Sequence, residues 1–174
     1  MKQDIQSILD AHRTSGIRLD LGCGGNKQPG FVGLDKRPLP GVDVVQDLET
    51  FPWCLPDGCA ELAVASHVVE HIDPAHGTFL RFMDEAWRVL EPGGKLMLSG
   101  PYAGSPGYWQ DPTHCNGCTE VTWWYFDPLE PHSGGNLYRI YHPKPWKILA
   151  NTYALHGNFE VALEKRREDE SYAL

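Results

Sequence analysis

The stretch Ile17–Asp35 reads I-R-L-D-L-G-C-G-G-N-K-Q-P-G-F-V-G-L-D and decides the fold of this 174-residue chain. Apolar residues alternate with Arg18 and Asp20 as far as Leu21, which is typical of a β-strand, and glycines then break the pattern. A glycine adopts positive φ angles and lets a ligand lie close to the backbone. Ligands of α/β folds bind at the carboxyl ends of parallel strands, so the sequence predicts a binding loop here.

A second apolar run, residues 31–34, ends at Asp35, whose carboxylate can accept hydrogen bonds from both hydroxyls of a ribose. The loop differs from a dinucleotide fingerprint because Lys27 occupies the third glycine position of G-x-G-x-x-G. Asp35 also follows the loop much sooner than the usual ~20 residues. NAD is therefore disfavoured, and the chain has no P-loop motif for a triphosphate. A tight structural turn is the alternative interpretation of the glycines.

The composition argues against two classes of binding partner, nucleic acids and membranes. A net charge of −8 and a pI near 5.4 give no general attraction to a phosphate backbone, so no nucleic-acid partner is expected. No apolar run is long enough to span a bilayer, and we expect no membrane contact and a cytoplasmic location. Five irregularly spaced cysteines are expected to be free thiols.

The rest of the chain alternates expected helices and strands, which indicates an α/β fold in a single domain, 1–174. Helices are predicted at 4–12, 77–90 and 119–126, and strands at 17–21, 31–35, 42–45, 61–66, 95–99, 137–142, 146–155 and 158–166. The last two strands should form an antiparallel hairpin. Only nine residues separate Leu21 from Phe31, so the first crossover helix must be reduced. Residues 101–136 are predicted to form a substrate loop or insert, and 167–174 a solvated tail.

Several stretches together resemble one family. They are L-D-L-G-C-G, G-L-D-K-R, D-L-E-T-F-P-W, A-S-H-V-V-E-H-I and W-R-V-L-E-P-G-G-K-L-M-L-S-G-P, in this order. Over about residues 17–101 the chain resembles class I S-adenosylmethionine-dependent methyltransferases, and it is most similar to their small "type 11"-like branch. The resemblance implies a Rossmann-like fold with a mostly parallel seven-stranded sheet, an antiparallel C-terminal hairpin and a reduced first crossover helix.

The resemblance also implies S-adenosyl-L-methionine as the cofactor. The loop after the first strand would hold its methionine and ribose, Asp35 its ribose hydroxyls and Asp47 its adenine, while His67 would lie beside the sulfonium. The cofactor-binding residues expected on this basis are Asp20, Gly22, Cys23, Gly24, Asp35, Lys36, Asp47, Leu48, Ser66 and His67.

Methyl transfer from a sulfonium needs no nucleophilic side chain, but a hydroxyl acceptor benefits from a general base. His71, His114 and Asp111 are the candidates, and a structural, hydrogen-bonded histidine is the alternative for each imidazole. In the Gly- and Pro-rich stretch 101–118, Tyr102 and Trp109 are the expected substrate residues. The acceptor is expected to be a small molecule or a sugar, by exclusion of nucleic acid.

Three alternatives stay open at this point. His67, Glu70 and His71 match the H-x-x-E-H pattern of zinc hydrolases, although Asp73-Pro74 interrupts the helix that this motif needs. A structural zinc site could form if His114, Cys115 and Cys118 came together with Cys54 and Cys59. A subunit that binds S-adenosylmethionine without catalysis is the third alternative. The sequence favours none of these, and no bound metal is expected.

Overall fold

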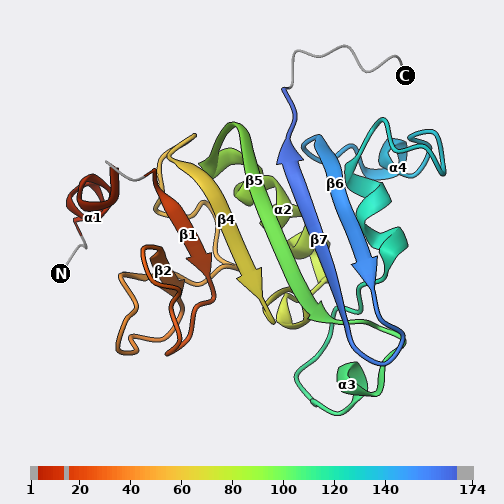
Figure 1. The fold of residues 1–174 in the computed structure, drawn as a ribbon, viewed down its shortest axis with the longest axis horizontal. Coiled ribbons are helices and arrows are strands. Elements are labelled where there is room, and N and C mark those ends of the chain that lie inside the picture. The colour runs from red at the N-terminus through yellow and green to blue at the C-terminus, as the bar shows by residue number, and fades with distance from the viewer. Residues whose placement is uncertain (1–3, 14–15, 168–174) are drawn as a thin grey trace.

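The computed structural model describes residues 4–13 and 16–167, and its centre is a seven-stranded sheet (Figure 1). The strand order is β3-β2-β1-β4-β5-β7-β6, in which β1 to β5 are parallel and β7 is antiparallel to both of its neighbours. The strands are β1 (Arg18–Leu21), β2 (Val32–Asp35), β3 (Val44–Val45), β4 (Ala60–Ser66), β5 (Leu90–Pro101), β6 (Trp146–Tyr153) and β7 (Asn158–Lys165). The predicted fold, with its C-terminal hairpin, is confirmed.

The strand order places a binding crevice between β1 and β4. The chain runs outward from β1 through β2 to β3 and then returns to the other side of β1 with β4. At such a reversal the loops that follow the two neighbouring strands leave in opposite directions and open a space at their carboxyl ends. Leu19 pairs with Val32 on one side and with Ala63 on the other, and all three are completely buried.

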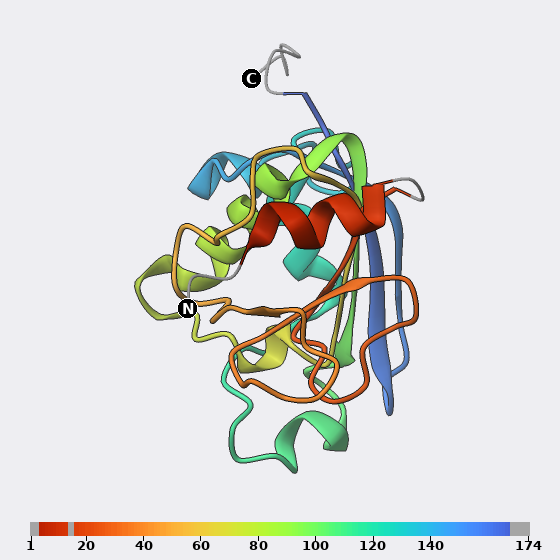
Figure 2. The same ribbon diagram turned by 90° about the vertical axis from the view of Figure 1, so that its left-hand side faces the viewer.

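The helices cover one face of the sheet. They are α1 (Ile5–His12), η2 (Val69–His71), η3 (Ala75–Gly77), α2 (Thr78–Val89), α3 (Pro106–Trp109), η4 (Glu120–Phe126) and α4 (Tyr138–Tyr141). Helix α2 lies behind the sheet in Figure 1, η4 and α4 lie beside β6, and the edge-on view of Figure 2 places all three on the same side of the sheet. Residues 22–31 form turns without a helix, which confirms the reduced first crossover. Among the described residues, the opposite face carries only this loop at β1 and β2, where most of the strand residues are buried, and it is open at β5, where Met97 is 49% exposed.

The prediction of a strand at residues 137–142 is wrong, because this segment forms the single helical turn α4. The amide of Arg139 donates to the carbonyl of Gly135, and that of His142 donates to the carbonyl of Tyr138. Tyr138 is buried and its hydroxyl donates to the carbonyl of Pro143 at 2.9 Å. A segment with one buried residue, Tyr138, followed by three exposed residues suits a helical turn at the edge of the core. The apolar residues of this segment only mimic a strand pattern.

The loop after β3 is held against α2 by hydrogen bonds with Glu85 and Arg88, an ion pair within that helix. Glu85 accepts hydrogen bonds from the amide of Trp53 at 2.8 Å and from Nε of Arg88 at 2.7 Å, and Arg88 also donates to the carbonyl of Leu55. Burial would raise the pKa of Glu85, but the hydrogen bonds from Arg88 and Trp53 outweigh it and lower the pKa below the ordinary 4.5. The loop that carries Asp47 and Leu48 is thus fixed in place by a charged carboxylate.

We expect Glu85→Gln to lower the free energy of unfolding by roughly 2 kcal/mol at neutral pH, because three charge-assisted hydrogen bonds, from the amide of Trp53 and from two nitrogens of Arg88, lose their anion. Since the folded pKa is lowered, the contribution of Glu85 is present above pH 4.5 and is lost as the pH falls through the folded value. Denaturant unfolding at several pH values measures this, with the exposed Glu91→Gln as control. Equal stability of Glu85→Gln and the parent would contradict the assignment.

Candidate functional site

A cavity of about 470 Å³ opens at the carboxyl ends of the parallel strands. It is lined by Gly22, Asp35, Lys36, Arg37, Asp47, Leu48, Glu49, His67, Val68, His71, Ile72 and Thr113. Apart from Thr113, the lining comes from the carboxyl ends of β1, β2, β3 and β4 and from the loops that follow these strands. The cavity therefore brings together residues that the sequence analysis placed separately at predicted strand ends, including the candidate base His71.

The glycine loop bends sharply where it leaves β1. Gly22 has a φ of +70°, and a Cβ atom there would come within 2.6 Å of Cγ2 of Val68. The amides of Gly22 and Cys23 both donate to the carbonyl oxygen of Leu34, at 2.7 and 3.0 Å. The loop is thereby fixed to β2, and the backbone at Gly22 forms part of the cavity wall.

Three predicted cofactor residues of β1 and this loop do not line the cavity, namely Asp20, Cys23 and Gly24. The Cys23 side chain is buried beneath the loop, and burial raises the pKa of its thiol to about 11. Asp20 is 6% exposed and accepts a 2.8 Å hydrogen bond from the amide of Gln28. Burial raises the pKa of Asp20, although the bond from Gln28 opposes this change. Asp20 and Cys23 thus lie beneath the loop and support it from within.

Asp35 lies at the end of β2 with its carboxylate at the cavity. Its Oδ2 accepts the amide of Gly24 at 2.9 Å, and its Oδ1 accepts the amide of Arg37 at 2.9 Å and Nε of Arg37 at 3.2 Å. Burial would raise the pKa of Asp35, but these hydrogen bonds outweigh it and hold the pKa below its ordinary value. Asp35 is therefore an ionised acceptor.

The loop after β3 supplies another part of the wall. The backbone amide of Glu49 donates to Oδ1 of Asp47 at 3.0 Å, and the indole of Trp53 donates to the carbonyl of Leu48 at 3.1 Å. Trp53 is 2% exposed and so anchors this loop to the core. Asp47 and Leu48 are thus held at the cavity as the sequence analysis expected.

The end of β4 is distorted at the cavity. His67 has a φ of +55°, rare for a residue with a side chain, and its amide donates to the carbonyl of Ser99 at 2.8 Å. Its Nδ1 lies 3.2 Å from Oε1 of Glu70. Ser66 is different: it accepts a hydrogen bond from the Ser99 hydroxyl and lines a separate cavity of about 420 Å³ on the open face of the sheet.

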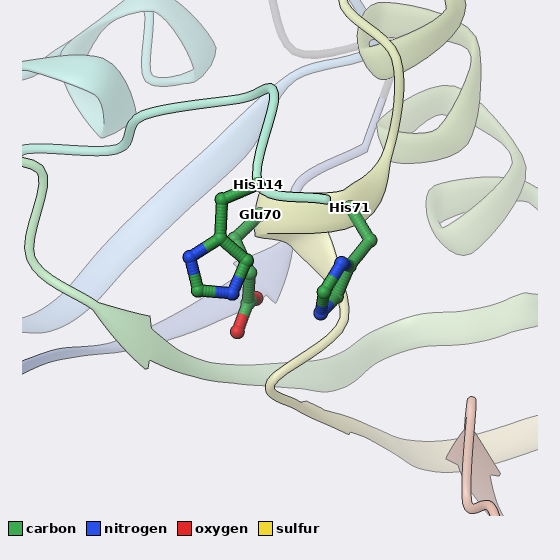
Figure 3. Close-up of side chains that lie close together, drawn as sticks. All are labelled: Glu70, His71 and His114. Carbon is green, nitrogen blue, oxygen red and sulfur yellow. The ribbon is translucent and has the colours of Figure 1, made fainter. Parts of the chain in front are cut away.

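The candidate catalytic residues lie together beside this end of the cavity. Glu70 and His71 come from η2, and His114 comes from the loop after α3 (Figure 3). The rings of His71 and His114 have centroids 4.8 Å apart. Asp111 lies 3.9 Å from Nε2 of His114, and hydrogen bonds from the amide and hydroxyl of Thr113 lower the pKa of Asp111.

The two predicted substrate residues lie outside the cavity lining. Tyr102 stacks on Tyr153 with centroids 4.8 Å apart, and its hydroxyl donates to Glu120 at 3.0 Å. Trp109 is 76% exposed and donates to the carbonyl of Ala103. The sequence analysis missed lining residues such as Val68 and Thr113. No local pattern marks Thr113, whereas Val68 follows directly after the predicted strand end at Ser66 and His67 and could have been found by that position.

The residues of the two zinc sites considered from the sequence do not come together in the combinations given there. In residues 4–13 and 16–167, one group of three or more potential ligand side chains has its ligand atoms within 4.8 Å of one another, and it consists of Glu70, His71 and His114. None of the cysteines belongs to it, and η2 is too short to place two histidines one helical turn apart. Within the same described residues, no helix has the length and hydrophobicity needed to cross a membrane.

Known proteins are similar to this chain in part of its sequence and in its fold. Residues 26–98 match the model of the methyltransferase domain family. A curated relative, an uncharacterized 37.1 kDa protein in transposon TN4556 of Streptomyces fradiae, is 32% identical over 125 residues, covering 58% of this chain and 34% of the relative. This chain therefore spans about a third of that relative's length.

Solved structures show the fold. An S-adenosylmethionine-dependent methyltransferase from Mesorhizobium loti is 15% identical, covers 90% of this chain and 96% of its own, and has a TM-score of 0.53. The 16S rRNA (adenine(1408)-N(1))-methyltransferase of Catenulisporales acidiphilia, solved as a mutant with its cosubstrate SAM, is 15% identical, covers 98% and 94%, and has a TM-score of 0.60. The resemblance inferred from the sequence is confirmed.

We expect Gly22→Ala to destabilise the fold by about 1–2 kcal/mol, because an alanine is strained at positive φ and its Cβ would meet Val68. Gly25→Ala is the matched control, since a Cβ there has no heavy atom within 4 Å and the φ is not positive. Its effect should stay within about 0.5 kcal/mol. Thermal unfolding of both variants measures the difference, and equal Tm values would contradict the described loop geometry.

Proposed function

We propose, from the methyltransferase domain that residues 26–98 match and the class I fold around it, that this chain binds S-adenosyl-L-methionine and methylates a small-molecule or sugar-type acceptor. The observation that carries the proposal is the 470 Å³ cavity at the carboxyl ends of the strands, with Asp35 and the glycine loop in its wall. Cavities of this size and position are typical small-molecule sites.

The hydrogen-bond acceptors in the cavity fit the proposed cofactor. A carboxylate offers about four acceptor positions, and Asp35 uses three of them for Gly24 and Arg37. The weakest is the 3.2 Å bond from the side chain of Arg37, which is 61% exposed and can move aside. Asp35 can then accept ribose hydroxyls, while Asp47 and the backbone of Leu48 can receive adenine.

When bound, the cofactor supplies an electrophilic methyl group on a sulfonium, so the protein has to orient the acceptor and exclude water. His71 and Thr113 line the cavity and are proposed to contact the acceptor. The wall holds the acidic residues Asp35, Asp47 and Glu49 against the basic residues Lys36 and Arg37. This small acidic excess and the net charge of −8 disfavour a polyanionic acceptor. The rRNA named for one structural relative is therefore not proposed as the acceptor here.

We expect Asp35→Ala to weaken binding of S-adenosylmethionine by roughly 2–3 kcal/mol, because a charged acceptor for the ribose hydroxyls is removed. Isothermal titration calorimetry measures this, with Asp35→Asn, which retains one carbonyl acceptor, expected between Asp35→Ala and the parent. The exposed Asp10→Ala is the control for the loss of one negative charge. Parent-like affinity of Asp35→Ala would refute the site.

The catalytic part of the proposal is tested by a screen of acceptors with methyl-labelled cofactor. Transfer of label to a hydroxyl-bearing small molecule or sugar supports it. Cofactor binding without transfer to any acceptor would instead support the alternative of a non-catalytic S-adenosylmethionine-binding subunit.

A further inference from the structure

We propose that Glu70, His71 and His114 bind a divalent transition-metal cation beside the cavity. Their ligand atoms all lie within 4.8 Å of one another, and Figure 3 shows the Glu70 carboxylate between the two imidazole rings. Ligand atoms around one tetrahedral zinc ion are about 3–3.5 Å apart, so small side-chain rotations bring all three onto one ion. This site is independent of the proposed function and replaces the expectation, drawn from the sequence, of a chain without metal.

The tautomer of His114 is set by its surroundings. Its Nδ1 lies 2.7 Å from the carbonyl oxygen of Tyr108. A carbonyl only accepts, so Nδ1 must carry the proton and donate it. The neutral ring then has its lone pair on Nε2, which is the atom left for a cation. Metal-bound histidines commonly donate their other nitrogen to a backbone carbonyl in this way.

The tautomer of His71 follows from a chain of hydrogen bonds. The hydroxyl of Thr113 donates its single proton to Oδ1 of Asp111 at 2.7 Å. Thr113 must therefore accept from Nδ1 of His71, 3.0 Å away, and that nitrogen carries the proton. The lone pair of His71 is thus also on Nε2. A carboxylate, acting through Thr113, orients this imidazole as outer residues of metal sites do.

Glu70 supplies the charge that a cation would neutralise. The residue is 1% exposed, and neither of its carboxylate oxygens has a hydrogen-bond partner among the described residues. Nδ1 of His67 approaches Oε1 to 3.2 Å, but not in the alignment of a hydrogen bond. A buried carboxylate without partners is unfavourable unless it is paired or coordinates a metal.

The backbone holds the two parts of the cluster together. The amides of Cys115 and Asn116 donate to the carbonyl of Glu70 at 2.9 and 3.1 Å, and the Asn116 side chain donates to the carbonyl of Val69. The loop that carries His114 is therefore fixed on η2. The cluster does not need to assemble from mobile parts.

The chemistry of the ligands selects the class of cation. Two imidazole nitrogens and one carboxylate oxygen suit Zn²⁺, Co²⁺, Fe²⁺ or Mn²⁺ and leave coordination positions open, whereas Mg²⁺ and Ca²⁺ prefer oxygen ligands alone. His71 also lines the cavity. An open position on the cation would thus be available to a molecule bound there.

The experiment uses the full chain, freed of metal with a chelator and titrated with Co²⁺ while its visible absorption is recorded. We expect about one Co²⁺ per chain, with absorption bands typical of nitrogen and oxygen ligands in a site of low coordination number, and displacement by Zn²⁺. Absence of binding up to about 1 mM Co²⁺ and Zn²⁺, an affinity too weak for a built site, would overturn the proposal.

Variants identify the ligands. Glu70→Gln, which keeps the shape of the buried side chain, and His114→Ala should each weaken Co²⁺ binding roughly 100-fold or more. His132→Ala, which removes an exposed imidazole stacked on Trp124, should bind as the parent does. Circular dichroism establishes that each variant is folded. Unchanged affinity in both Glu70→Gln and His114→Ala would place the cation elsewhere and overturn the proposal.

Thr113 gives a graded test of the same geometry. Thr113→Ala removes the acceptor that orients His71 and should weaken Co²⁺ binding roughly tenfold, while Thr113→Ser should restore it. A structural role of Thr113 alone would leave metal affinity unchanged. Titration with S-adenosylmethionine in the metal-free protein separates the two proposals, because cofactor binding can fail while the Co²⁺ site persists, and the reverse.

Discussion

The carbonyl oxygen of Leu34 accepts hydrogen bonds from the amides of both Gly22 and Cys23, and the site depends on this contact. It turns the chain back on β2 directly after β1 and brings Gly24 within reach of the Asp35 carboxylate. The turn requires a φ of +70° at Gly22, with no room for a Cβ against Val68. A glycine at this position therefore determines where the loop runs, and the loop in turn forms one wall of the cavity.

The shortness of the first crossover has a second consequence for the architecture. Without a helix between β1 and β2, only the loop that follows β1, among the described residues, covers the second face at these two strands, and the same face is open around Met97 of β5. Stability must come from the covered face, where Phe82, Trp123 and Trp146 are completely buried. On this covered face, Glu85 of α2 pairs with Arg88 and accepts a hydrogen bond from the loop that carries Asp47. The packed side of the molecule therefore also holds part of the cavity wall in place.

The sequence predicted the features that depend on local pattern. Alternation of apolar residues marked β1, a short continuous apolar run marked β4, apolar residues three and four positions apart marked α2, and strand ends marked Asp35 and Asp47. The prediction was wrong at residues 137–142, because a four-residue element is too short for its period to distinguish a helical turn from a strand. The sequence could not separate residues that line the cavity, such as Gly22, from those that shape the loop from within, as Asp20 and Cys23 do, since both kinds lie at or just after the end of the same strand.

The sequence by itself determined the α/β order, the reduced crossover and the family resemblance, because each rests on neighbours along the chain. Only the tertiary structure decided that His114 lies beside Glu70 and His71, since the loop is fixed there by backbone bonds from Cys115 and Asn116 to the carbonyl of Glu70. In the folded chain the Glu70 carboxylate is buried, has no hydrogen-bond partner among the described residues and lies 3.2 Å from Nδ1 of His67. Such pairings between distant segments depend on how loops close over a sheet, and residue type and spacing do not encode that geometry locally.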